Sequence, residues 1–395
     1  MNSQIQPIKF QTSLLGSLPR PKEILQAQRK LQKGEIFEED FTQLVIEYTE
    51  QAIKFQENLG LDIITSGELG RDNYVSFIAR KLHGIRMMSM IEILDYIEDK
   101  EAFHEILDIL DVPAMRIKNA ICTGKLGFRN GIVVDELLWM KKFTPKPIKI
   151  TLPGPYLMTR SMWLPELSKK AYPDKEALGE AVIQMLTKEI ALLQQHGADI
   201  IQLDEPVLTE VVFSEGKTRS FMCAALSEKK DPTDELAFAT HLLQSVVQKV
   251  DRNISKIGLH ICRGNWSKDE SILLKGPYTP LIPLMEQVCP DILFLEFSTP
   301  RAGELSSLLE NDTIRKKCIL GLGVMNPRTD TVETKESMIQ SAKKALQYVS
   351  TEQLWLNPDC GFATFSNRPV NEMDTIIQKV SNMVQAAKEL RRKYV

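Results

Sequence analysis

The stretch Lys256-Ile-Gly-Leu-His-Ile-Cys-Arg-Gly-Asn-Trp266 starts as a β-strand and ends in side chains that can take part in chemistry. Its apolar residues stand at every second position, which is the pattern of a strand. His260 and Cys262 are two positions apart, so their side chains point to the same face. An imidazole and a thiolate side by side are two of the four ligands that zinc prefers. A packed histidine beside a buried cysteine would give the same short pattern, so the rest of the chain decides between the two.

Apolar stretches like this one recur along the chain and alternate with helical patterns. Near-continuous apolar strands that alternate with helices indicate a parallel sheet covered on both faces, and eight such units predict an α/β fold of the (β/α)8 TIM barrel type. The alternative, an open doubly wound sheet, usually begins with a glycine-rich phosphate-binding turn, and Leu14-Leu-Gly-Ser-Leu18 is not one. The predicted strands are residues 10–18, 62–68, 147–155, 199–206, 256–262, 291–298, 318–326 and 354–361, and the predicted helices are residues 39–59, 73–82, 175–196, 233–250, 333–349 and 371–392.

Residues 84–146 interrupt this alternation of strands and helices and are predicted to be a helical insertion after the second strand–helix unit. They contain a methionine-rich, acidic helical pattern around residues 91–110, a loop around 124–131 and a further helix near 135–143. The insertion could cover the mouth of the barrel as a lid, or it could only pack on the outside. We expect a single barrel domain over residues 1–395.

The composition of the 395 residues is that of an ordinary globular protein, with 43% hydrophobic and 26% charged residues. The net charge of −3 gives no reason to expect binding to nucleic acid or to an anionic membrane surface. No apolar run approaches the length of a membrane span, and the polar residues 1–11 lack the core of a signal peptide. The six cysteines are scattered without a Cys-x-x-Cys motif, which favours a reducing cytoplasm over a disulfide framework.

Reactive side chains stand at the ends of the predicted strands, where the active site of a barrel lies. They are Ser17, Glu68, Asp204, His260, Cys262, Glu296 and Cys360. Strands five, six and eight would bring the last four of these to one side of the mouth. Two thiolates, an imidazole and a carboxylate suit zinc better than magnesium or calcium, which prefer oxygen ligands. The sequence therefore predicts a zinc site formed by these four residues.

The charges of this set indicate what the metal would do. Two thiolates and one carboxylate leave the zinc site with one net negative charge, which makes the ion a poor Lewis acid toward water. Such a site is better suited to exchange one ligand for an incoming thiol, which loses its proton and becomes a nucleophile. Glu68 and Asp204 could then hold the ammonium group of an amino-acid substrate. They could instead cap helices or pair with an arginine such as Arg71.

Several of these segments resemble the catalytic barrel of the cobalamin-independent methionine synthase family and its single-barrel relatives, a group that also resembles the zinc-dependent epoxyalkane–coenzyme M transferases. The matching segments are Leu15-Gly-Ser17, Gly67-Glu68 with Arg71-Asp-Asn73, Asp204-Glu-Pro206, His260-x-Cys262, Glu296 and Asn357-Pro-Asp-Cys-Gly361. The resemblance extends from about Thr12 to the C-terminus, apart from the insertion. It implies that Leu15 and Ser17 contact the carboxylate of homocysteine. It implies further that Glu68 and Asp204 bind its amine and that the four residues named above hold zinc.

The chain departs from this family in two ways. Long-form methionine synthases carry a second, N-terminal barrel that helps to hold a polyglutamylated folate, and we expect no counterpart here. At the exit of the seventh strand the family carries a histidine assigned to protonating the departing folate, whereas this chain has Val324-Met-Asn-Pro-Arg-Thr329. Arg328 is the catalytic candidate at that place, although a guanidinium keeps its proton at ordinary pH and is a poor general acid. The methyl donor, folate or another compound, is therefore left open.

The leading hypothesis is an enzyme, a zinc-dependent methyltransferase that transfers a methyl or other alkyl group to a small thiol, by resemblance homocysteine. One alternative keeps the zinc and the thiol but opens an epoxide with coenzyme M. An excess of arginines at the mouth would argue for it, and Arg263, Arg301 and Arg328 are the candidates. Another alternative is a zinc-binding barrel without catalysis. The oligomeric state is left open.

Overall fold

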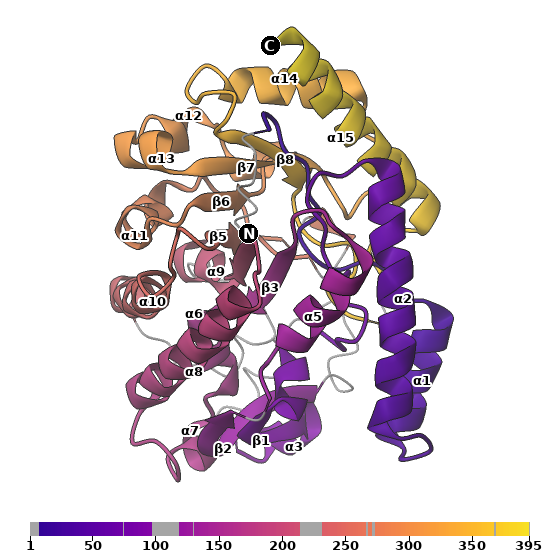
Figure 1. Cartoon of the computed structure of the whole chain (residues 1–395). Helices are drawn as coiled ribbons and strands as arrows, with labels where there is room; N and C mark the ends of the chain where they lie inside the picture. The colour runs from indigo at the N-terminus through magenta and orange to yellow at the C-terminus, as the bar shows by residue number, and fades with distance from the viewer. Residues whose placement is uncertain are drawn as a thin grey trace.

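The computed structural model describes residues 8–73, 75–96, 118–128, 130–213, 231–265, 268–270, 273–366 and 369–394. Six parallel strands form one sheet and follow each other in chain order (Figure 1). Each strand pairs with the next one, so residues at equivalent positions of neighbouring strands lie next to each other. The strands are β3 (Lys149–Pro153), β4 (Ile200–Asp204), β5 (Lys256–Ile261), β6 (Ile292–Leu295), β7 (Ile319–Met325) and β8 (Leu354–Pro358).

Two short extended segments complete the ring between β8 and β3. Residues 12–13 pair with Leu356 of β8 on one side and with Ile63 on the other, and Ile64 pairs with Ile148 at the start of β3, all in parallel. The pairing therefore returns to the strand where it began, as the predicted (β/α)8 barrel requires. The predicted fold class is confirmed, although isolated bridges stand where the sequence predicts two full strands.

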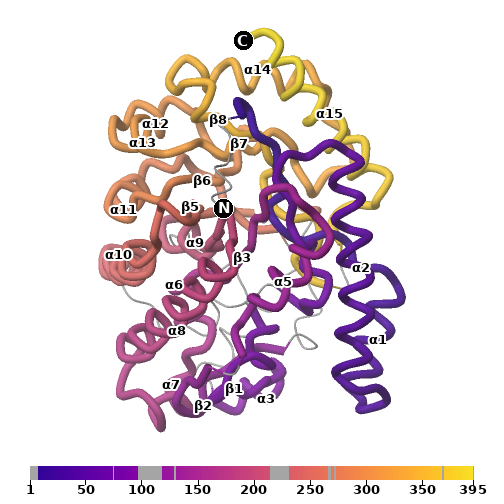
Figure 2. The backbone as a smooth tube through the Cα atoms, viewed as in Figure 1, coloured from indigo at the N-terminus to yellow at the C-terminus, as the bar shows by residue number. Residues whose placement is uncertain are grey.

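Helices surround the sheet on its outer side (Figure 1). The tube in Figure 2 shows that the N-terminal helix α2 lies beside the C-terminal helix α15, and the two helices are in contact. Helix α2 buries one apolar face, which includes Phe41 and Ile53, and it ends at Gly60, whose φ of 88° suits glycine. No helix in the described ranges is both long and apolar enough to span a membrane.

Among the described residues, the helices are α-helices of the outer layer and three short 3₁₀ helices. The α-helices are α1 (Lys22–Gln32), α2 (Glu38–Leu59), α5 (Val134–Phe143), α6 (Pro155–Met162), α7 (Pro165–Ser168), α8 (Lys175–Gln195), α9 (Val207–Phe213), α10 (Pro232–Val247), α11 (Ile282–Val288), α12 (Ser306–Leu309), α13 (Asp312–Lys317), α14 (Lys335–Ala345) and α15 (Met373–Lys393). The 3₁₀ helices are η1 (Ser76–Arg80), η5 (Thr279–Leu281) and η6 (Pro300–Ala302). The helix predicted over residues 73–82 is thus only η1. The helices that were not predicted are α1, α6, α7, α9, α11, α12 and α13.

The interior of the barrel holds its own small apolar cluster, separate from the layer between strands and helices. It comprises Leu15, Ile63, Ile200, Ile292, Phe294 and Trp355. A lysine lies among these side chains: Lys149 is 1% exposed, and its Nζ donates to Ser13 Oγ at 3.1 Å and lies 4.2 Å from the centre of the Phe294 ring. Burial on both faces explains why the predicted strands have no polar side.

The predicted helical insertion is wrong for residues 82–128 as far as they are described, whereas the helix predicted near residues 135–143 is present as α5. Strand β1 (Leu82–Ser89) pairs antiparallel with β2 (Lys118–Phe128), and the short helix α3 (Met90–Leu94) follows β1. Most of the methionine-rich pattern around residues 91–110 lies outside the described residues. Helix α5 is not part of an insertion, because it packs between α2 and α8 in the outer layer. The backbone N–H groups of residues 132–134, at and just before its first residue, donate to Glu189 of α8, which fixes this position.

Candidate active site

Three predicted metal ligands converge at the carboxyl ends of the strands. His260 is in β5, Cys262 follows that strand directly, and Cys360 follows β8. Their ligand atoms all lie within 4.8 Å of one another, and all three side chains are buried. We call these residues the His–Cys–Cys group. Two thiols and an imidazole at one point are a donor set that fits zinc, whose catalytic sites use three protein ligands.

Asp204 fixes the orientation of the imidazole. It stands opposite His260 in the register of β4 and β5, and its Oδ1 is 2.9 Å from His260 Nδ1. Gln202 Nε2 donates both to this oxygen, at 2.8 Å, and to the carbonyl of Leu15, at 2.9 Å. Burial lowers the pKa of His260, but the hydrogen bond and charge of Asp204 outweigh it and raise the pKa above its usual value. A carboxylate on Nδ1 leaves Nε2 as the ligand nitrogen.

The thiols of Cys262 and Cys360 shift each other's pKa in opposite directions. A hydrogen bond from Cys360 lowers the pKa of Cys262 and raises the pKa of Cys360 well above its usual value. Cys262 is therefore the more acidic thiol of the pair. The carbonyl of Cys262 also accepts a hydrogen bond from Thr209 Oγ1 at 2.8 Å, which ties the ligand to helix α9.

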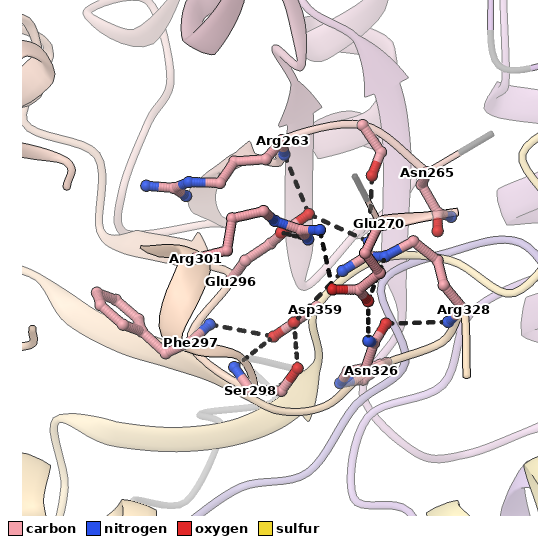
Figure 3. A network of polar contacts seen from close by, with 12 residues as sticks. Arg263, Asn265, Glu270, Glu296, Phe297, Ser298, Arg301, Asn326, Arg328 and Asp359 are labelled. Atoms are coloured by element: carbon pink, nitrogen blue, oxygen red, sulfur yellow. Dashed lines mark hydrogen bonds and ion pairs between the residues drawn. The ribbon is translucent and has the colours of Figure 1, made fainter. Parts of the chain in front are cut away.

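Glu296, the fourth predicted ligand, is not part of the metal-ligand grouping found among the described residues. Its Oε2 accepts from Arg301 Nη2 at 2.9 Å, and its Oε1 accepts from the backbone N–H of Arg263 at 3.0 Å and lies 3.5 Å from Arg328 Nη1. Figure 3 shows this carboxylate beside the guanidinium of Arg301. Burial raises the pKa of Glu296, but the charges of Arg328 and Arg301 overcome it and lower the pKa below its usual value.

The arginines belong to a larger buried network. Arg328 Nη2 lies 3.8 Å from Asp359, and its Nε lies 3.6 Å from Glu270, which also accepts from Arg301 at 3.2 Å and from Asn326 (Figure 3). Burial lowers the pKa of Arg328, but these carboxylates raise it, so the guanidinium keeps its proton. A cavity of about 520 Å³ lies against this network. It is lined by Lys268, Glu270, Asn326, Arg328, Thr329, Asp330 and Thr331.

Glu68, predicted to bind the substrate amine, lies in strained backbone. Its φ is 56°, in the left-handed region, and such conformations are typical of functional sites. Its Oε1 accepts from Thr151 Oγ1 at 2.7 Å and lies 3.6 Å from Arg71 Nη1. A Cβ on Gly16 would lie 2.1 Å from the same oxygen, so only glycine allows the backbone of Leu15–Ser17 to pass this carboxylate.

Ser17 joins that segment to the loop that carries Cys360. The Ser17 carbonyl accepts from Phe362 N at 2.9 Å, and its Oγ accepts from Ala363 N at 3.3 Å. A Cβ on Gly361 would lie 2.2 Å from this Oγ. The residues predicted for the substrate and those predicted for the metal therefore occupy one region, although their individual roles stay predictions.

Some residues that build the site were not predicted. They are Thr151, Gln202, Asn265, Glu270 and Asn326. The period-two pattern could have found Gln202, because it stands two positions before Asp204 on the same strand. No pattern in the sequence indicates Glu270. It lies in the connection after β5, and its partners Arg301 and Arg328 are far away in sequence.

A family model that matches most of the chain shows to which protein family the chain belongs. The model for the catalytic domain of cobalamin-independent synthase covers residues 10–389. The chain belongs to the cobalamin-independent synthase family. It is therefore an enzyme of the methyltransferase class, as the names of its relatives in this family state.

Methionine synthases and homocysteine methyltransferases are among the similar proteins. The methionine synthase of Pyrococcus furiosus is 25% identical over 382 residues, which are 96% of this chain and 93% of that protein. The 5-methyltetrahydropteroyltriglutamate–homocysteine methyltransferase of Bacillus thuringiensis is 26% identical over 382 residues, but this match covers only 42% of that longer protein.

Solved structures show the same fold. A B12-independent methionine synthase from Shewanella sp. W3-18-1, in complex with selenomethionine, has a TM-score of 0.71 at 20% identity and covers 98% of both chains. A putative vitamin-B12 independent methionine synthase from Listeria monocytogenes has a TM-score of 0.68 at 20% identity, with 97% of this chain and 98% of that chain covered. These likenesses extend over nearly the whole barrel.

Proposed function

We propose that this protein transfers a methyl group to the sulfur of homocysteine, with zinc held by the His–Cys–Cys group. The observation that carries the proposal is the convergence of one imidazole and two thiols, from strands far apart in sequence, at the mouth of the barrel. The names of the relatives, methionine synthase and homocysteine methyltransferase, support the choice of substrate. When bound, zinc would stabilise a substrate thiol as its thiolate and so supply a nucleophile at neutral pH.

The protein's own residues would bind and orient the amino-acid end of homocysteine. In the described part of the chain, Oε2 of Glu68 and Oδ2 of Asp204 take part in no hydrogen bond, while the other oxygen of each carboxylate is fixed by its neighbours. These two oxygens would accept from the ammonium group. The segment Leu15–Ser17 would contact the carboxylate. Holding the thiol in one place relative to the methyl donor lowers the entropic barrier to transfer.

For the donor we propose a methylated folate, as the name of the Bacillus relative suggests. Arg328 would then act through its charge. It keeps its proton because carboxylates surround it, so it cannot protonate the departing group.

Five described cysteines are free, which supports a reducing cytoplasm as the place of action.

The alternative substrate coenzyme M is less well supported. Its sulfonate would need unpaired cations, and two of the three candidate arginines, Arg301 and Arg328, already lie against Glu270 and Glu296. The third, Arg263, forms no ion pair among the described residues, and its guanidinium lies over the ring of Tyr278. A sulfonate thiol also has no ammonium group for Glu68 to bind.

The test compares Cys360→Ser with Cys289→Ser, a matched change of a free cysteine outside the His–Cys–Cys group. Zinc per chain is measured by elemental analysis and methyl transfer by methionine formation. We expect Cys360→Ser to lose more zinc affinity and activity than the roughly 10–100-fold that is typical for a residue that only supports a ligand. We expect Cys289→Ser to keep both. Full zinc content and activity in Cys360→Ser would refute the proposal.

A further inference from the structure

We infer that Glu136, on the outer helix α5, is a positioning residue for the substrate ammonium group: it holds the guanidinium of Arg71 in place, so that Arg71 lies beside Glu68 but leaves the carboxylate of Glu68 open to the substrate. The inference rests on the proposed function for the role of Glu68. It gives a task in substrate recognition to a residue that was not predicted to belong to the site.

The guanidinium of Arg71 is bound by Glu136 in a bidentate contact. Its Nε donates to Glu136 Oε1 at 3.0 Å, and its Nη2 donates to Oε2 at 2.9 Å. Nη1 donates to the hydroxyl of Thr151 at 3.0 Å, and Nη2 donates to the carbonyl of the same residue at 3.1 Å. These hydrogen bonds can use four of the five N–H groups of the guanidinium. Glu68 Oε1 lies 3.6 Å from Nη1, which is close enough for an ion pair but too far for a hydrogen bond.

Two chains of hydrogen bonds lead from Glu136 to Glu68. One runs through side chains: Arg71 donates to the hydroxyl of Thr151, which donates its own proton to Glu68 Oε1 at 2.7 Å. The other reaches the backbone: Ser66 Oγ donates to Glu136 Oε2 at 2.9 Å and accepts from the N–H of Glu68 at 3.1 Å. Glu136 therefore fixes both the carboxylate of Glu68 and its backbone, which has a φ of 56°.

Burial makes the partner of each charge important. The side chains of Arg71, Glu68 and Glu136 are 3%, 7% and 14% exposed, so water compensates their charges poorly. Burial raises the pKa of Glu136, but the charge and hydrogen bonds of Arg71 outweigh this effect and lower the pKa below its usual value. Burial raises the pKa of Glu68 as well, and the charge of Arg71 is the strongest effect that opposes it. Arg71 thus helps to keep Glu68 ionised.

An arginine at this place also competes with the substrate. Hydrogen bonds between a guanidinium and a carboxylate are among the strong ones in proteins. If Arg71 turned from Glu136 to Glu68, it would satisfy the carboxylate that the ammonium group of homocysteine needs. The bidentate contact with Glu136 opposes this turn. Preference for a thiol that carries an ammonium group therefore depends on Glu136 as well as on Glu68.

The first experiment compares crystal structures of the wild type and of Glu136→Gln, both without a ligand. The amide keeps the size of the side chain but removes its charge, so we expect Arg71 to move to Glu68 and to form a hydrogen bond of about 2.7–2.9 Å. An unchanged distance of 3.6 Å between Arg71 and Glu68 in the variant would overturn the inference. If Glu136→Gln does not fold, the wild-type structure decides, because Arg71 hydrogen-bonded to Glu68 there would also overturn it. These outcomes do not depend on zinc or on the substrate.

The second experiment measures the dissociation constants of homocysteine and of 2-mercaptoethanol for the zinc-loaded protein by calorimetry. We expect Glu136→Gln to weaken homocysteine binding by roughly 10–100-fold and to leave 2-mercaptoethanol binding unchanged. The double variant Glu68→Gln/Glu136→Gln should lose no more than Glu68→Gln alone, because the effects of residues in one network do not add. Asp135→Asn, the same change one position earlier in α5, should bind both thiols as the wild type does.

The outcomes separate this inference from the proposed function. Equal weakening of both thiols, or additive losses in the double variant, would show a merely structural role of Glu136 and overturn the inference. A loss in Glu68→Gln without a loss in Glu136→Gln would overturn it and leave Glu68 as the residue that binds the ammonium group. Homocysteine binding that depends on neither residue would overturn the ammonium site of the proposed function together with the inference.

Discussion

Asp204 shows how one side chain of the site can serve two purposes. One of its oxygens orients His260, and the other is free of hydrogen bonds among the described residues, so it can meet a substrate ammonium group. Glu68 has the same division, with Thr151 on one oxygen. At the scale of single residues, each carboxylate is thus held by the protein and still has one oxygen for a ligand.

The role of Glu68 can be tested with the substitution Glu68→Gln. Loss of a charge-assisted hydrogen bond costs about 1.5–3 kcal/mol, so kcat/KM for homocysteine should fall by roughly 10–100-fold. Activity with 2-mercaptoethanol, which has no ammonium group, should change little. Glu50→Gln, a change at a partly exposed position of α2, serves as the control variant. An equal loss of activity with both thiols would show that Glu68 does not bind the ammonium group of homocysteine.

Lys149 gives a prediction on pH. Burial lowers its pKa to about 7, although Asp204 and Glu68 partly offset this effect, whereas its ordinary pKa is 10.5. Between these two values the unfolded chain binds a proton that the folded protein does not, so the free energy of unfolding should rise with pH. The rise amounts to about 5 kcal/mol at most, from the size of the pKa shift.

Urea unfolding of wild type and Lys149→Met at pH 7 and pH 10 measures this effect. The difference between the two proteins isolates Lys149 from other groups that titrate in the same range. We expect the stability of the wild type relative to Lys149→Met to increase with pH. A difference that stays constant from pH 7 to pH 10 would show that Lys149 is protonated in the folded protein.

At the scale of elements, helix α15 holds the loop that carries Arg328. Lys379 of α15 is fully buried, and its Nζ donates to the carbonyls of Asn326 and Thr331 at 2.9 and 2.6 Å and to Glu333 Oε2 at 2.9 Å. The loop after β7 is thus fixed from outside the barrel. This arrangement sets the position from which Arg328 reaches the site.

The substitution Lys379→Met should loosen this loop. We expect the protein to lose about 2–4 kcal/mol of stability, because three hydrogen bonds are removed and Glu333 loses its ion pair with Lys379. Amide hydrogen exchange in residues 326–333 should become faster. Lys388→Met, a change at an exposed position of the same helix, should alter neither quantity. Unchanged exchange in this loop would show that other contacts hold it.

The sequence predicted the elements that have a clear period and missed those that depend on distant partners. Helix α8 was predicted to within a residue or two, because its apolar face and its glycine stop are local signals. The pairing of β1 with β2 was missed, because an antiparallel hairpin across a long insertion has no short turn to mark it. The place of α5 in the outer layer depends on Glu189 of α8, which is far away in sequence.

The same distinction applies to the site. His260, Cys262 and Cys360 could be predicted, because strand ends of a barrel meet at one mouth. The arginine contacts of Glu296 could not, because they depend on loops whose course the residue pattern does not determine.

At the scale of the whole molecule, Asp62 fastens the two ends of the chain where the ring closes. Its Oδ2 accepts from the N–H and the hydroxyl of Thr12 at 2.8 and 2.7 Å and pairs with Arg391 of α15. Arg391 also donates to the carbonyls of Lys9 and Phe10. One carboxylate therefore connects the first barrel segment, the second segment and the last helix.

The substitution Asp62→Asn tests this closure. We expect a loss of about 2–3 kcal/mol in the free energy of unfolding by urea, because charge-assisted hydrogen bonds are replaced by neutral ones. Asp312→Asn removes the ion pairs of an exposed aspartate on α13 and should change stability by less than about 0.5 kcal/mol. Similar effects of the two substitutions would mean that the closure does not depend on Asp62.

The central claim is that the His–Cys–Cys group holds zinc and presents it to a thiol. Zinc-edge X-ray absorption on the zinc-loaded protein, with and without homocysteine, tests this claim most directly. We expect two sulfurs and one imidazole nitrogen around zinc, and a third sulfur when homocysteine is added. A shell without sulfur, or a shell that homocysteine leaves unchanged, would contradict it.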